Sequence, residues 1–116
     1  MRPLTLLLLF AVALLPSRLL AHHGWSQYHR DQTVTITGLI TEVDFTNPHV
    51  SINVEAGGKT WKAIMAPVYG MQTRGLPSGS LRSGMEVTLV GHPHRSNPNE
   101  MRAERITVGG KTVELR

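Results

Sequence analysis

Two turn signals divide the stretch from Gly38 to Ala66 into segments in which apolar and polar residues alternate. Such alternation places every second side chain on one face of a β-strand. At the first turn, Asn47-Pro48, the proline lacks the amide hydrogen that a strand ladder needs, so it belongs at a strand entrance. At the second turn, Gly57-Gly58 is typical of a two-residue hairpin. The stretch therefore predicts three consecutive strands of a small β-barrel.

The same pattern continues along the chain. The predicted strands cover residues 32–45, 49–55, 59–65, 85–91, 101–108 and 111–115, with one or two helical turns at 68–76. In the first strand the apolar residues change from even-numbered to odd-numbered positions between Ile40 and Val43, which indicates a bulge. Gly38 in the same strand indicates a bend or a close backbone approach. Five strands with a short helix or loop after the third match the all-β OB-fold. Another small β-barrel or roll is the alternative.

The first 21 residues have the layout of a secretory signal peptide. Arg2 precedes an apolar run from Leu4 to Leu15, and a more polar segment ends at Ala21. The run is shorter than the ~20 residues that a membrane-spanning helix needs. We therefore expect export to the periplasm, cleavage after Ala21, and no stable membrane span afterwards. The predicted segments are a signal peptide (1–21), an N-terminal arm (22–31) and an OB-like barrel domain (32–116).

Composition excludes several classes of function. Cleavage removes two of the twelve Lys and Arg residues, against eight Asp and Glu, and the remaining charges alternate in sign. A nucleic-acid-binding protein would need a clustered basic stripe. The chain has no cysteine, which excludes disulfides, thiolate metal sites and thiol nucleophiles. The carboxylates are scattered without a catalytic arrangement, so we expect a protein that is not an enzyme.

All six histidines follow the predicted cleavage site, and imidazole suits copper and zinc. Cleavage after Ala21 would make His22 the N-terminus, whose amine and ring nitrogen could chelate copper. Cleavage one residue earlier would place His23 third, in the amino-terminal arrangement that binds Cu(II). The alternative is that both are solvated tail residues. We expect Trp25 and Tyr28 to pin this arm to the domain, because each has an apolar body.

The other histidines lie at predicted strand ends. His92 and His94 follow the fourth strand, which in an OB topology ends near the arm with its three histidines. A polar loop with scattered histidines is the alternative. His49 is expected on the outward face of the second strand, at the opposite end of the first. There we prefer a structural role, with Asn47 capping the turn and His49 bonding the backbone, over a metal site shared with Met71.

Five segments resemble a family of uncharacterised bacterial exported proteins, a domain of unknown function. They are Ala21-His22-His23-Gly24-Trp25, the pattern G-x-I-x-E-V-x-F-T-N-P-H from Gly38 to His49, Lys59-Thr60-Trp61, residues 71–76 and residues 102–116. The resemblance covers essentially the whole mature chain and implies no activity. In architecture the chain also resembles periplasmic OB-fold copper chaperones, which bind Cu(I) through His, Met and Trp. His49, Trp61 and Met65 are of those types but differ in spacing, so this likeness implies fold only.

The sequence thus predicts a small periplasmic binding protein that carries copper or a similar ion. Its expected ligands are His22, His23, His92, His94 and His49. The alternative is a metal-free accessory module that docks another periplasmic protein.

Overall fold

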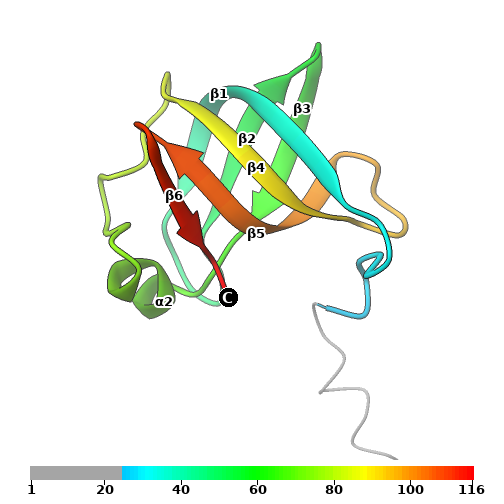
Figure 1. Ribbon diagram of the computed structural model, residues 1–116, viewed down its shortest axis with the longest axis horizontal. Coiled ribbons are helices and arrows are strands. Elements are labelled where there is room, and N and C mark those ends of the chain that lie inside the picture. Colours follow the sequence, from blue (N-terminus) through cyan, green and yellow to red (C-terminus); the bar gives the residue numbers. More distant parts are fainter. Residues whose placement is uncertain (1–24) are drawn as a thin grey trace, which may run out of the picture.

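A computed structural model describes residues 25–116 and shows an all-β barrel (Figure 1). The expectations for the signal peptide, His22 and His23 lie outside the described residues. The strands are β1 (Val34–Asp44), β2 (Ser51–Ala56), β3 (Lys59–Ile64), β4 (Glu86–Pro93), β5 (Glu100–Val108) and β6 (Lys111–Glu114), with helix α2 (Val68–Thr73) after β3. The predicted fold class, element order and two diglycine hairpins are confirmed.

The strand order is β3-β2-β1-β4-β5-β6, and a parallel pairing of β3 with β5 closes the barrel. All other neighbours are antiparallel, and β6 adds to β5 as a hairpin. This is the OB-like connectivity that the sequence predicts. Figure 1 shows α2, the C-terminus and the first described residues on the same side of the barrel.

The long strand β1 belongs to two strand pairs. Its first half pairs with β4 and its second half with β2, with a register shift between Ile40 and Glu42. This shift is the bulge that the change of apolar phase predicts. At Gly38 a Cβ would lie 2.0 Å from the carbonyl oxygen of Glu55, so the predicted close backbone approach is also confirmed.

The core contains one face of each strand and the underside of α2. Its fully buried members include Ile40, Ile52, Leu89 and Ile106. Met71 of α2 is also fully buried, so its sulfur packs in the core, and the alternative of a site shared with His49 is not supported.

The turn after β1 differs from expectation in one contact. The Oδ1 atom of Asn47 accepts a hydrogen bond from the backbone N–H of Val68, 3.1 Å away, at the start of α2. The expectation that Asn47 caps its own turn is therefore wrong. The side chain satisfies an otherwise unpaired amide at the start of the helix, and this bond ties the turn to α2.

Candidate functional site

The N-terminal arm runs beside the end of β4. The N–H of His29 donates to the carbonyl of Pro93 at 2.9 Å, and Tyr28 forms a β-bridge with His94. The Tyr28 side chain is 4% exposed, and its hydroxyl donates to Glu100 at 2.6 Å. The predictions that the arm approaches His92 and His94, and that Tyr28 pins it, are confirmed.

His94 uses both ring nitrogens within the fold. Its Nδ1 accepts the backbone N–H groups of Ser96 (3.0 Å) and Asn97 (2.8 Å), while its Nε2 lies 3.7 Å from Glu100. The ring also packs edge-on against Tyr28. A metal ion on Nδ1 would displace two backbone hydrogen bonds, so the geometry favours a structural role in this loop.

His92 is oriented differently. Its Nδ1 lies 2.7 Å from the carbonyl oxygen of Gln32, which can only accept, so Nδ1 carries the proton. In the neutral ring Nε2 then bears the lone pair, and it faces Glu104 Oε1 at 3.3 Å. Because the Nε2 lone pair of His92 and the carboxylate oxygen of Glu104 repel each other at this distance, a proton or a cation is needed between them. Ligands of one tetrahedral ion, each ~2.0 Å from it, lie about 3.3 Å apart. However, Arg116 Nε also contacts this oxygen, at 3.1 Å.

Trp25 brings the arm to His49. The two rings meet edge-on with their centroids 5.2 Å apart, so the expectation that His49 lies apart from the arm is wrong. The reason is the closure of the barrel. Ile64 pairs with both Ser51 and Arg102, so the start of β2 lies close to the part of β5 that Trp25 covers.

Two arginines complete the surroundings of Trp25. The Cζ atoms of Arg102 and Arg116 lie 3.4 Å and 4.1 Å from the centroid of the indole, which indicates cation–π contacts. Burial and the charge of Arg116 lower the pKa of Arg102 to about 10, and Nε of Arg102 has no hydrogen-bond partner among residues 25–116. Burial, followed by the charges of Arg116 and Arg102, also lowers the pKa of His49. Each of these effects favours the neutral form of the His49 ring.

The sequence interpretation missed both arginines. Alternation along β5 does place Arg102 on the outward face, but no local pattern shows that Trp25 stacks on it. Within residues 25–116 no group of three or more His, Asp or Glu residues is placed to hold a metal ion, so His92 and Glu104 have no third such ligand there. Nor does that part of the chain contain a helix long and apolar enough to cross a bilayer.

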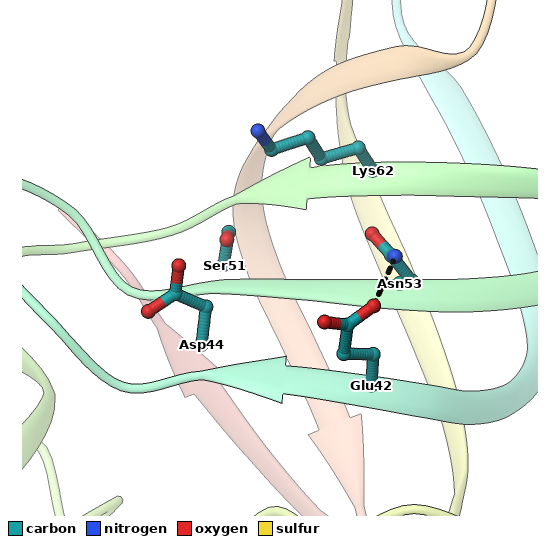
Figure 2. A pocket seen from close by; sticks show the side chains of 5 residues that line it. All are labelled: Glu42, Asp44, Ser51, Asn53 and Lys62. Atoms are coloured by element: carbon teal, nitrogen blue, oxygen red, sulfur yellow. Dashed lines mark hydrogen bonds between the residues drawn. The ribbon is translucent and has the colours of Figure 1, made fainter.

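A polar hollow of about 260 Å³ lies on the outer face of the barrel (Figure 2). Side chains from three neighbouring strands line it: Glu42 and Asp44 of β1, Ser51 and Asn53 of β2, and Lys62 of β3. The Asn53 amide nitrogen donates to Glu42 at 3.1 Å. Sequence reasoning missed this hollow too, although alternation places these residues outward on their strands.

Residues 11–102 match the model of a family described as "Family of unknown function (DUF6152)". The chain belongs to this family. The predicted resemblance to an uncharacterised family is thereby confirmed. The DUF6152 match includes all six histidines and ends within β5, before β6 begins. No curated protein matches the chain.

Proposed function

We propose that this DUF6152 protein is exported to the periplasm, binds a copper ion through histidines of its arm and barrel, and catalyses no reaction. The proposed ligands are His22, His23 and His49. The contact between Trp25 and His49, with ring centroids 5.2 Å apart, is the observation that supports this choice.

The reach of the chain supports this set of ligands. An extended residue spans at most about 3.6 Å, so the Cα of His23 lies within about 7 Å of the Cα of Trp25, and that of His22 within about 11 Å. This short tether to Trp25, whose ring contacts His49, is the reason for proposing His22 and His23 as the other ligands. Cleavage after Ala21 would add the amine of His22 as a further nitrogen ligand.

The electrostatics favour a particular oxidation state. A metal ion binds the neutral imidazole, and the lowered pKa of His49 favours that form. Arg102 and Arg116 repel a cation nearby, although Glu104, which lies beside both, offsets part of their charge. The repulsion that remains is twice as large for a divalent ion as for a monovalent one. Imidazole binds both copper and zinc, so the lower charge is the reason that Cu(I) fits this position better than Zn²⁺.

The remaining histidines are not proposed as ligands of this copper ion. His92 and Glu104 could hold a second ion, but Arg116 already neutralises that carboxylate. His94 holds its loop through Nδ1. A metal-free accessory role stays a prediction from the sequence.

The test is a competition titration of Cu(I) against a chelator of known affinity, with the chain that begins at His22. We expect one ion per chain and at least about tenfold weaker binding after His49→Ala, since a lost ligand costs more than 1.4 kcal/mol. His29→Ala is the matched control, because His29 bonds the barrel only through its backbone. The Cu(I) affinity of this variant should equal that of the unmodified chain. Equal affinity of the His49→Ala variant and the unmodified chain would overturn the proposal.

A further inference from the structure

The polar hollow lies over three regularly paired strands. Register pairs Glu42 with Asn53 and Asn53 with Lys62, so one row of outward side chains crosses three strands. Asp44 and Ser51 form the next row. Figure 2 shows all five side chains on the same face, with the amide oxygen of Asn53 turned away from Glu42. Backbone ladders fix where these five residues leave the sheet, so the same side chains border the hollow with or without a ligand.

Charge is separated across the hollow. Both carboxylates belong to β1, while the ammonium of Lys62 belongs to β3, two strand spacings or about 10 Å away. The strand between them supplies the neutral Ser51 and Asn53. Among the described residues, Lys62 forms no ion pair with Glu42 or Asp44. One wall is therefore negative, the opposite wall is positive, and the floor can accept and donate hydrogen bonds.

We propose that this hollow binds a small zwitterion of the size of a free amino acid or a dipeptide. The ammonium of the ligand faces Glu42 and Asp44, its carboxylate faces Lys62, and Ser51 and Asn53 bond the groups between. A volume of about 260 Å³ is below the ~300–1,000 Å³ of pockets for larger organic ligands. This inference is independent of the proposed copper site, because the two share no residue.

The charge pattern distinguishes this ligand from simpler ones. A free cation could pair with Glu42 and Asp44 but would leave Lys62 without a partner, and a free anion could pair with Lys62 but would be repelled by the two carboxylates. A neutral sugar could form hydrogen bonds but would leave the three charges unpaired. Only a molecule that carries both charges pairs with both walls.

The experiment is an NMR titration of the full chain from His22 with glycylglycine. We expect saturable amide shifts at Glu42, Asn53 and Lys62, with a dissociation constant of about 0.1–10 mM, because small ligands on open surfaces gain little energy per atom. Methylammonium, acetate and glucose are the comparison ligands, and none should give saturable shifts in this range. The proposal is overturned if glycylglycine leaves these amides unshifted, or if a comparison ligand saturates them equally well.

Variants then test the two walls separately. Lys62→Gln and Asp44→Asn should each weaken glycylglycine binding at least about fivefold, because the first removes the charge of the positive wall and the second removes one of the two charges of the negative wall. Lys111→Gln is the matched control, an exposed lysine on β6 outside the hollow, and should bind as the unmodified chain does. The amide spectrum of each variant reports whether it is folded. Unchanged binding by a folded Lys62→Gln variant would contradict the proposal. The His49→Ala variant should still bind glycylglycine, which separates failure of this inference from failure of the copper proposal.

Discussion

Trp25 joins groups from distant parts of the chain. Its indole contacts His49, two residues before β2, together with Arg102 on β5 and the C-terminal Arg116. It also lies 6.1 Å from the ring of Tyr28 in the arm. Burial and the hydrogen bond to Glu100 raise the pKa of Tyr28, so its hydroxyl stays protonated and continues to donate. These contacts hold the arm against the barrel at the proposed copper site.

Trp25→Ala should therefore destabilise the fold. We expect a loss of about 1–3 kcal/mol in the free energy of unfolding, since a partly buried aromatic ring and two cation–π contacts disappear. Urea unfolding followed by circular dichroism measures this loss. Trp25→Phe is the control and should retain more than half of the stabilisation that the Trp25 side chain provides. A Trp25→Ala midpoint equal to that of the unmodified chain would show that the Trp25 contacts add nothing to stability.

At the scale of the element, β1 shows how much of the fold can be predicted from local pattern. After Ile40 the apolar residues change to the other set of alternating positions. Because side chains in a strand alternate between two faces, these residues can stay in the core only if one extra residue is inserted, and this predicts the bulge. The role of Asn47 could not be predicted in the same way. Its partner Val68 is 21 residues away, and no spacing in the sequence indicates that contact.

Gly38 offers a prediction at this scale. A Cβ in Gly38→Ala would meet the backbone of Glu55 at 2.0 Å, so β1 and β2 would have to separate locally. We expect a loss of at least about 3 kcal/mol in the free energy of unfolding, as for severe overpacking. A thermal melt measures the effect, and Thr35→Ala, at an exposed position on the same strand, is the control. If both variants melt at the same temperature, the close backbone approach is not a real constraint.

At the scale of the whole molecule, closure of the barrel creates the candidate site. The parallel pairing of Ile64 with Arg102 brings β2 to β5, and this places His49 within reach of the arm. The sequence predicts the arrival of the arm beside His92 and His94, because that follows from the pairing of β1 with β4. It does not predict the contact with His49, which depends on how far Trp25 reaches across β5.

The central claim is that copper binds between the N-terminal histidines and His49. The most direct measurement is an anomalous difference map, recorded at the copper edge, from a crystal of the chain that begins at His22 loaded with Cu(I). We expect one strong peak within about 2.1 Å of a ring nitrogen of His49, with further nitrogen ligands from His22 or His23. A peak bound instead at His92 and Glu104, or no peak at all, would contradict it.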